Sequence, residues 1–270
     1  MVVGQQRKNG VKVVFANAQS IISKINEVRA VMPSINPDIF AVTESWANED
    51  IGNDLLIING YELVSRVDRN DTDRGRGGGI LVYAKKELDV LAEDVMTDFN
   101  QCTGIKIKRR CGDVNLYVVY RSPNSTKAND DDLVKWVKEM RGPTIIIGDF
   151  NFPDIDWSAG IAGSRGRNFL DATQETFMEQ LVNEPTHRSG NILDLVLCNE
   201  EEMVTEVKAE GRLGKSDHDI LSFQMCVENN EKKEQWAAVD FARANFAVMR
   251  EDAQKINWNE ELQGKDVDGM

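Results

Sequence analysis

Hydrophobic residues recur along the chain with two spacings, one typical of strands and one typical of helices. Short apolar runs of the kind that fills a buried strand occupy residues 11–17, 39–45, 77–85, 114–121, 144–147, 191–197 and 220–227. Apolar residues three or four positions apart predict helices from Ser20 to Pro33, over 130–141 and near 167–183. Several strands are joined by segments too short for a parallel crossover. We therefore expect an α/β fold of mixed sheets packed on each other with helices outside, in preference to one doubly wound sheet.

The pattern also predicts where the compact part of the chain ends. Residues 1–10 are polar and form a predicted tail, and residues 11–227 hold all the strands of the pattern. ENNEKKEQ at 228–235 reads as a polar linker. The rest of 228–270 reads as an amphipathic helix with too little apolar surface to form a domain of its own.

Composition narrows the possible classes of function. The net charge of -13 argues against a protein that holds nucleic acid by bulk electrostatics, but not against one that uses a bound cation and local arginines. No apolar run approaches the roughly 20 residues that cross a bilayer, and the N-terminus lacks the apolar centre of a signal peptide, so we expect no membrane contact and no secretion. The scattered cysteines are expected to be reduced core thiols: Cys102, Cys111, Cys198 and Cys226.

Polar residues stand at the ends of the predicted strands, where burying them unpaired would be costly. They are Asn17, Glu44, Tyr120, Arg121, Asp149, Asn151, Asp194 and the triplet Ser216, Asp217 and His218. Each residue alone is compatible with an ordinary hydrogen-bonded strand end. Together they are harder to explain in that way, because strand ends in α/β proteins converge on one crevice, where sites are built.

These residue types suit metal-assisted hydrolysis of a phosphodiester. Glu44 with Asp217 could hold one hard divalent cation, since Mg²⁺ prefers one or two carboxylates together with water and substrate phosphate. His218 braced by a carboxylate such as Asp194 could take a proton from water. Neutral hydrogen bonds to a phosphoryl oxygen could come from Asn17, Tyr120 and Asn151.

The ordered set of motifs resembles a known family. The set comprises NAQSI (17–21), TESW (43–46), VYRSPN (119–124), GDFNFPDIDW (148–157), LVNEPTHRSGNILDLVL (181–197) and SDHDIL (216–221). It resembles the endonuclease/exonuclease/phosphatase superfamily, which includes deoxyribonuclease I and the apurinic endonucleases. Within this superfamily, the motifs are most similar to those of the endonuclease domain of non-LTR (LINE-type) retrotransposons, and the similarity covers nearly all of residues 11–227.

The resemblance implies a fold and a set of roles. The fold would be a four-layer α/β sandwich, with two mixed β-sheets face to face and helices outside. Glu44 would be the principal ligand of Mg²⁺, or of Mn²⁺ in its place, helped by Asn17 and Asp217. His218, paired with Asp194, would activate or orient the attacking water.

The remaining roles concern the phosphate and the DNA backbone. Asp149 would protonate the leaving 3′ oxygen or, in a competing assignment, serve as the base itself. Asn151 and Tyr120 would hold the scissile phosphate. The residues expected near the DNA backbone are Arg121, Thr186 and Ser216.

Other conspicuous residues receive structural interpretations. His187 is interpreted as a surface residue or a backbone contact, outside the catalytic set. Gly77, Gly78 and Gly79 precede a strand rather than a helix, so close chain packing is expected instead of a phosphate cradle. Only HRSGNIL separates Thr186 from Asp194, which predicts a tight turn without a DNA-reading hairpin and therefore a modest sequence preference.

Three hypotheses remain open at this stage. The first is a Mg²⁺-dependent endonuclease that nicks double-stranded DNA and leaves a 3′-hydroxyl primer for target-primed reverse transcription of a retrotransposon. The second is a relative acting on abasic DNA or another phosphoester, which the glutamine at position 19, where apurinic endonucleases tend to carry an acidic residue, disfavours. The third is a catalytically dead binding domain. For the first, the resemblance implies a nuclear protein, fused to a reverse transcriptase beyond Met270 and monomeric as an isolated domain.

Overall fold

The structure is a computed structural model that describes residues 10–69, 77–109, 112–226 and 255. The chain divides into two units, Met1–Asn229 and Asn230–Met270, and the fold below belongs to the first. The predicted N-terminal tail lies outside the described residues except for Gly10. The predicted C-terminal helix lies outside them except for Lys255.

Two six-stranded sheets and one two-stranded ribbon account for the strands of the described part. The first sheet contains, in spatial order, β13 (Val204–Arg212), β14 (Asp219–Cys226), β1 (Gly10–Asn17), β2 (Ile39–Thr43), β4 (Ile80–Lys85) and β3 (Tyr61–Val67). The second contains β11 (Glu179–Gln180), β12 (Asp194–Cys198), β8 (Thr144–Asp149), β7 (Val114–Tyr120), β6 (Cys102–Ile107) and β5 (Val90–Glu93). The ribbon pairs β9 (Ile155–Asp156) with β10 (Ile161–Ala162). Both large sheets are mixed, because β1–β2 and β7–β8 run parallel and their other pairings are antiparallel.

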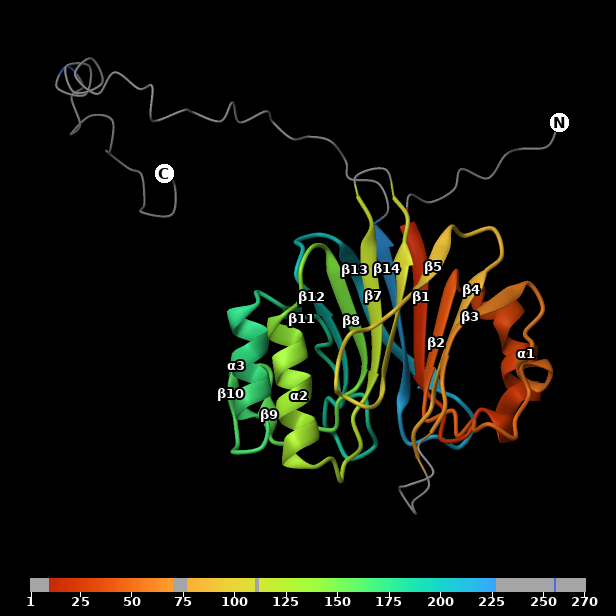
Figure 1. Ribbon diagram of the computed structural model, residues 1–270, viewed down its shortest axis with the longest axis horizontal. Coiled ribbons are helices and arrows are strands. Elements are labelled where there is room, and N and C mark those ends of the chain that lie inside the picture. Colours follow the sequence, from red (N-terminus) through yellow and green to blue (C-terminus); the bar gives the residue numbers. More distant parts are fainter. Residues whose placement is uncertain (1–9, 70–76, 110–111, 227–254, 256–270) are drawn as a thin grey trace. The chain divides into compact units, whose positions relative to one another are not determined.

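Residues along the central strands face the two sides of each sheet in turn, and together they form three apolar layers. In β1, Val13 and Phe15 point into the core between the sheets, whereas Val14 points to the outer face, where α1 (Ile25–Ile35) packs. In β8, Ile147 faces the other sheet, and Ile146 faces the side covered by α2 (Lys127–Lys138) and α3 (Arg167–Glu175). Figure 1 shows α1 on one side of the paired sheets and α2 with α3 on the other. The predicted four-layer sandwich is therefore confirmed.

All three predicted helices have the wrong bounds. The first begins with a 3₁₀ turn, η1 (Ile22–Lys24), and continues through Pro33, which lies in its last turn, to a left-handed cap at Asn36. Proline is tolerated there because few hydrogen bonds remain to be lost. The third ends at Glu175, and Phe177 follows with a φ of 55° and a largely exposed ring. The spacing of four between Phe169, Thr173 and Phe177 therefore does not mark one helix face.

The other differences concern polar or short elements. The predicted helix over 130–141 starts earlier, at Lys127, where the Thr126 side chain caps it, and ends at Lys138. The sequence pattern did not identify β3, β5, β6 or β13, nor the 3₁₀ turn η2 (Asn53–Leu56). These four strands include three that form edges of their sheets and mix charged with apolar residues. No helix of the described residues is long and apolar enough to cross a membrane.

Candidate active site

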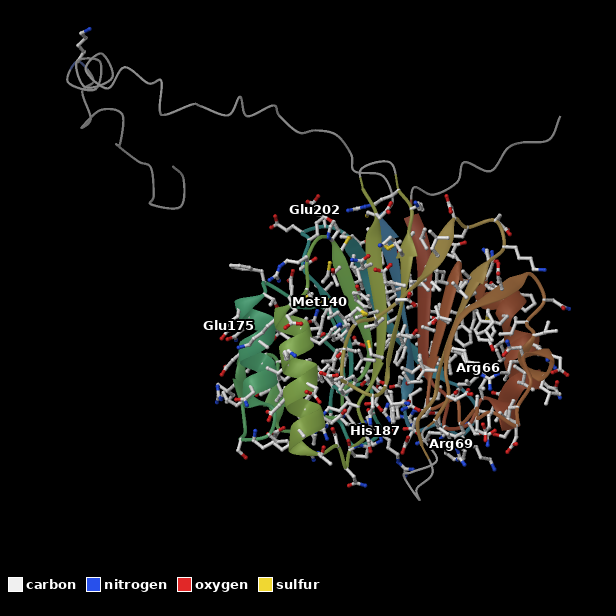
Figure 2. The ribbon with its side chains drawn as sticks, in the orientation of Figure 1. Arg66, Arg69, Met140, Glu175, His187 and Glu202 are labelled. Atoms are coloured by element: carbon white, nitrogen blue, oxygen red, sulfur yellow. The ribbon has the colours of Figure 1, made fainter. Side chains whose placement is uncertain are left out.

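The ends of six segments meet at one edge of the sandwich. Asn17 ends β1 and pairs in register with Thr43 at the end of the parallel β2, one residue before Glu44. In the second sheet Tyr120 pairs with Asp149 at the parallel ends of β7 and β8, and β12 begins opposite them with Asp194. The start of β14, next to His218, lies at the same edge because β14 runs antiparallel to β1. In Figure 2, His187 and Arg69 mark this end, and Glu202 lies at the opposite one.

Unusual backbone conformations hold Glu44 in place. Glu44 and Trp46 have positive φ values of 47° and 58°, which are uncommon for residues with a side chain. The backbone N–H groups of Ser45 and Trp46 donate to the carbonyls of Gly79 and Gly78. A Cβ on Gly79 would lie 2.4 Å from Ser45 Oγ, so a glycine is required there. The glycines thus serve close chain packing beside the site, as the sequence predicted.

The amide of Asn17 joins two acidic residues from different sheets. Its Nδ2 donates to Glu44 Oε1 at 3.0 Å and to Asp149 Oδ2 at 2.9 Å. The other Glu44 oxygen, Oε2, accepts from the indole N–H of Trp46 at 3.3 Å. The predicted ligands Glu44 and Asn17 are therefore neighbours, and Asp149 lies beside them.

Asp149 is a fully buried acid without enough hydrogen bonds to satisfy it. Its Oδ1 has no hydrogen-bond partner, and its side chain has no exposed surface. Burial raises the pKa of Asp149 well above the usual value, and the neighbouring Asp194 raises it further. A group of this kind, at a crevice, is a candidate for proton transfer or for binding a cation.

His218 lies among three carboxylates. Its Nδ1 is 2.8 Å from Asp194 Oδ2, and its Nε2 is 3.9 Å from Asp149 Oδ2 and 3.8 Å from Asp217 Oδ1. Burial lowers the pKa of His218, but the hydrogen bond and charge of Asp194, with the charges of Asp149 and Asp217, outweigh burial and raise it to about 9. The hydrogen bond and charge of Asp194 therefore favour the protonated form of His218.

Tyr120 and Asn151 border the same crevice. Burial raises the pKa of Tyr120, as do the charges of Glu44 and Asp149 and a hydrogen bond with Glu44, so the phenol keeps its proton. Asn151 has a φ of 48° and donates from Nδ2 to the carbonyl of Arg121 at 3.0 Å. Both side chains thus lie at the crevice, with their placement fixed by neighbours.

The three residues predicted to contact the DNA backbone lie in the interior, and this prediction is corrected. Arg121 is fully buried; its Nε and Nη2 contact Asp130 at 2.7 and 2.8 Å, and its Nη1 donates to the Asn151 carbonyl at 2.7 Å. Thr186 is fully buried, and its Oγ1 accepts from the backbone N–H of Asp194 at 3.0 Å. Ser216 Oγ donates to the carbonyl of Asn17 at 2.8 Å. Because their polar atoms are used inside the fold, these residues position site residues rather than meet DNA.

Two residues next to Asp217 were not predicted as part of the site. Gln19 Nε2 donates to Asp217 Oδ1 at 2.6 Å, and His187 Nε2 lies 3.2 Å from Asp217 Oδ2. The ring of His187 also packs edge-to-face on that of His218, with centroids 4.8 Å apart. The side chain of His187 therefore lies against the site, and its exclusion from the catalytic set stays a prediction. Its place directly after Thr186 was visible in the sequence, but nothing there showed that the turn pairs with the segment before β14.

The donor set fits a hard divalent cation. Glu44 and Asp149 offer carboxylate oxygens, and the buried Asp149 Oδ1 lacks a partner that a cation would supply. Asn17 directs its Nδ2 at these two residues, and its Oδ1 accepts from the N–H of Gln19 at 3.2 Å. Both oxygens of Asp217 are contacted by neighbouring side chains, Oδ1 by Gln19 Nε2 at 2.6 Å and Oδ2 by His187 Nε2 at 3.2 Å, and the role of Asp217 as a ligand of this cation stays a prediction.

Comparisons with known proteins find a matching family model and similar folds. Residues 114–222 match the family model described as "Endonuclease-reverse transcriptase". No curated protein matches the chain. The fold is similar to the endonuclease domain of TRAS1, a telomere-specific non-LTR retrotransposon, at 16% identity and a TM-score of 0.62 over 82% of this chain and 100% of that one. It is also similar to the AP endonuclease LMAP from Leishmania major, at 16% identity and a TM-score of 0.62 over 80% of this chain and 88% of that one. A third is the 3′-5′ exonuclease (NExo) from Neisseria meningitidis, at 16% identity and a TM-score of 0.61 over 79% of this chain and 99% of that one.

The fold is the one found in these nucleases and in an endonuclease/exonuclease/phosphatase family protein from Leptotrichia buccalis, which has 17% identity and a TM-score of 0.54. Within it, the segment 114–222 matches the endonuclease-reverse transcriptase family model. That segment supplies Tyr120, Asp149, Asp194 and His218 to the crevice, so the family match covers most of the site. The resemblance predicted from the sequence is confirmed.

Proposed function

We propose that the chain is a Mg²⁺-dependent endonuclease that nicks double-stranded DNA and leaves a 3′-hydroxyl end. The observation that carries the proposal is the Asn17 amide, which brings Glu44 and Asp149 together beside the His218–Asp194 pair. Carboxylates, an imidazolium and neutral donors at one crevice are the groups that hydrolysis of a phosphodiester requires.

The chain's own residues have distinct roles in this proposal. Asp194 holds His218 through Nδ1, and the proton on His218 Nε2 is donated to a phosphoryl oxygen as negative charge develops there. In its ionised form, which a bound cation would favour, Asp149 accepts the proton of the attacking water. The bond from phosphorus to the 3′ oxygen breaks, and that oxygen takes a proton from solvent water to become the 3′-hydroxyl. This is the competing of the two predicted assignments of Asp149, and we prefer it because the carboxylates around His218 favour its protonated form, which has no free nitrogen to act as the base.

The remaining groups orient the substrate and the metal. Glu44, Asn17 and Asp149 would hold Mg²⁺, or Mn²⁺ in its place, and the ion supplies Lewis-acid stabilisation of the phosphate when bound. Tyr120 keeps its proton and donates it in a hydrogen bond to the scissile phosphate together with the Asn151 amide.

The biological context of the proposal is retrotransposition. The description of the matching family model supports a fusion with a reverse transcriptase, and TRAS1 is described as a non-LTR retrotransposon. The 3′-hydroxyl end would prime reverse transcription at the target, which would take place in the nucleus. As an isolated domain the chain would act as a monomer.

Supercoiled plasmid tests the activity. With Mg²⁺, the protein is expected to convert supercoiled plasmid to nicked circles whose ends a polymerase extends, and His218→Ala is expected to slow this step by about 10²–10⁴-fold. Removal of the ion by a chelator should stop it.

The same assay separates the alternatives. Cleavage confined to plasmid that contains abasic sites would replace the proposal with an apurinic endonuclease. Equal nicking by the parent and by His218→Ala would point to a contaminating nuclease. No turnover with any DNA would leave a binding domain.

A further inference from the structure

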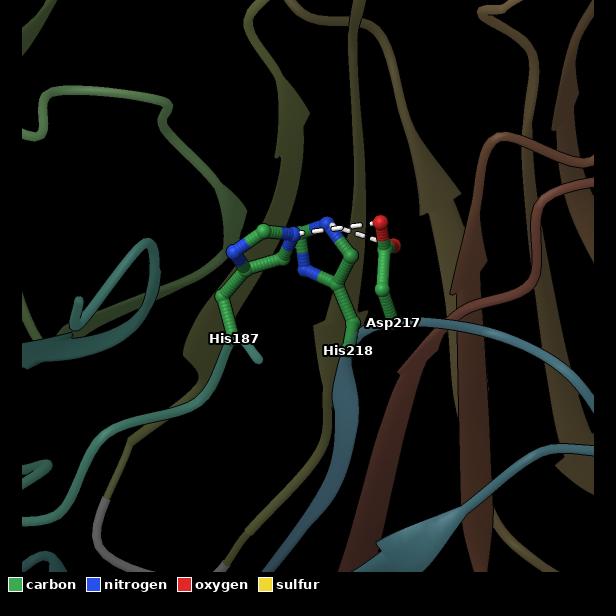
Figure 3. A group of neighbouring side chains, drawn as sticks. All are labelled: His187, Asp217 and His218. Carbon is green, nitrogen blue, oxygen red and sulfur yellow. Dashed lines mark ion pairs between the residues drawn. The ribbon is translucent and has the colours of Figure 1, made fainter. Parts of the chain in front are cut away.

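A second group of ligand-type side chains lies at the rim of the crevice. It consists of His187, Asp217 and His218, whose ligand atoms all lie within 4.8 Å of one another. His187 Nε2 is 3.2 Å from Asp217 Oδ2, and His218 Nε2 is 3.8 Å from Asp217 Oδ1. Figure 3 shows both imidazoles directed at the same carboxylate. We name these three residues the rim cluster.

The backbone fixes the rim cluster in advance. His187 and His218 form an antiparallel β-bridge between the turn that follows Thr186 and the segment that precedes β14. The N–H of Arg188 donates to the Asp217 carbonyl at 2.9 Å, and the N–H of Asp219 donates to the Thr186 carbonyl at 2.7 Å. Two distant parts of the chain are therefore held together at the level of the main chain, which lowers the ordering cost of binding a ligand between their side chains.

The far nitrogen of each imidazole already has an oxygen partner. His218 Nδ1 contacts Asp194 Oδ2 at 2.8 Å, and His187 Nδ1 contacts Ser189 Oγ at 2.7 Å. Histidines that bind metals almost always donate their other ring N–H to such an oxygen, which orients the ring. The N–H of Ser189 also donates to His187 Nδ1 at 3.1 Å, which favours the tautomer with the proton on Nε2. An ion would shift that proton to Nδ1, where Ser189 Oγ can accept it.

The rim cluster is open on one side. The side chains of Asp217 and His187 are 28% and 19% exposed, whereas that of His218 is 6% exposed. Water can therefore complete the coordination of an ion held by three protein ligands.

We propose that the rim cluster is a binding site for a borderline transition-metal ion such as Zn²⁺, separate from the oxygen ligands of Glu44, Asn17 and Asp149. Two imidazole nitrogens, one carboxylate oxygen and water form a ligand set typical of zinc with an open position. Imidazole ligands favour zinc over magnesium, which takes oxygen ligands and keeps much of its water. The two sites therefore select different ions.

Ion binding at the rim cluster would inhibit the proposed nuclease. The ion would occupy His218 Nε2, the atom that lies 3.9 Å from Asp149 and 3.8 Å from Asp217, so this atom is no longer available to the phosphoryl oxygen. This consequence depends on the proposed function, whereas binding of the ion does not.

Calorimetric titration of the full, tag-free chain with ZnCl₂ tests binding in the absence of DNA. His187→Gln removes one nitrogen ligand, and Arg188→Gln alters the neighbouring exposed residue as a matched control. The parent and Arg188→Gln should bind one Zn²⁺ with the same affinity, and His187→Gln should bind it at least about tenfold more weakly. Circular dichroism checks that both variants are folded. Equal affinity of the parent and His187→Gln, or equal affinity of the parent for MgCl₂ and ZnCl₂, would overturn the proposal.

Plasmid nicking in excess Mg²⁺ tests the inhibition. For each protein, the rate with ZnCl₂ is divided by its own rate without ZnCl₂. The ZnCl₂ concentration that halves this ratio is expected to be about tenfold lower for the parent than for His187→Gln. The same ZnCl₂ dependence in both proteins would show that an ion at the rim cluster does not inhibit nicking. If the parent does not nick DNA at all, the proposed nuclease function fails, and the calorimetric comparison still decides whether the metal site exists.

Discussion

The side-chain amide of Asn17 links the two sheets at the point where their acidic residues meet. It donates to Glu44 from the first sheet and to Asp149 from the second, and Ser216 Oγ donates to its backbone carbonyl. An amide can donate to two carboxylates without adding charge, so it lowers the cost of placing both acids at one crevice. Asn17 stands at the end of an apolar strand, at a position where an aliphatic residue would otherwise pack.

Asp194 is expected to act through His218. In Asp194→Asn, the neutral amide can no longer stabilise a proton on both nitrogens of His218, and the rate of plasmid nicking should fall by about 10²–10⁴-fold. Single-turnover rates at saturating plasmid measure the chemical step. Thermal unfolding serves as the control for folding. A folded variant with the parent's rate would show that His218 works without its carboxylate.

Gly148 is expected to tolerate no side chain. Its φ is 151°, and a Cβ would lie 1.9 Å from the carbonyl oxygen of Val119 in the neighbouring strand. Gly148→Ala should therefore lower the free energy of unfolding by about 3 kcal/mol or more, as measured by urea titration. Gly211→Ala, where a Cβ meets no atom within 4 Å, should change it by less than about 1 kcal/mol. Similar values for the two variants would contradict the close approach of β7 and β8.

Among the secondary-structure elements, helix α2 is connected to the residue that follows β7 by a buried ion pair. Arg121 is fully buried, and the side chain of Asp130 is only 13% exposed. The guanidinium also lies 3.9 Å from the ring centroid of Phe152. Asp130→Asn leaves a buried guanidinium without its counter-charge, so we expect a loss of about 3 kcal/mol in the free energy of unfolding at neutral pH. A loss near zero would mean that solvent reaches Arg121.

The same pair predicts a pH dependence. Burial raises the pKa of Asp130, but hydrogen bonds from Arg121 and Ser125 and the charge of Arg121 outweigh burial, so the pKa lies below its usual 3.8. The contribution of the charged pair is thus fully present above pH 3.8 and is lost as the pH falls through the lower pKa of the folded protein. The difference in stability between the parent and Asp130→Asn should narrow in that range. Urea unfolding at a series of pH values measures it, and a constant difference would refute the assignment.

The turn between Thr186 and Asp194 is short, as the sequence predicted. The N–H of His187 donates to the carbonyl of Asn191, and the N–H of Gly190 donates back to the carbonyl of His187. No hairpin protrudes from this turn to read base edges, so we expect nicks at many positions, with preferences that follow DNA shape. Sequencing the nicked ends of a long duplex measures their distribution. One sharply dominant position would be inconsistent with this turn.

Sequence periodicity located the central strands better than the edges and helix ends. Buried strands such as 144–147 are apolar on both faces, so no alternative element fits them. Strands such as β13 mix charges with apolar residues, and their pairing comes from neighbours that are distant in the chain. The end of α3 is set by the backbone at Phe177, which side-chain spacing does not report.

The chemical identity of the site was predictable from the sequence, but its contacts were not. Strand ends were sufficient to group Asn17, Glu44, Asp149, Asp194 and His218. The direction of a side chain depends on local packing, and for that reason Arg121 and Thr186 were expected at the DNA and lie in the interior. His187 was missed for a similar reason, since only the β-bridge brings it to His218.

The negative charge of the whole molecule makes a bound cation necessary where DNA meets the crevice. The chain has a net charge of -13, and the crevice itself contains Glu44, Asp149, Asp194 and Asp217. A DNA phosphate that approaches these carboxylates is repelled unless a divalent ion lies between them. The dependence of nuclease activity on the ion therefore tests whether the carboxylates of the crevice hold a cation for the DNA phosphate.

The most direct test is the dependence of plasmid nicking on the Mg²⁺ concentration, compared between the parent and Glu44→Gln. The glutamine keeps the size of the side chain but removes the charge that would hold the ion. The account predicts that the variant needs at least about tenfold more Mg²⁺ to reach half of its maximal rate, a loss typical even of residues that only support metal ligands. The same Mg²⁺ dependence in both proteins would contradict it.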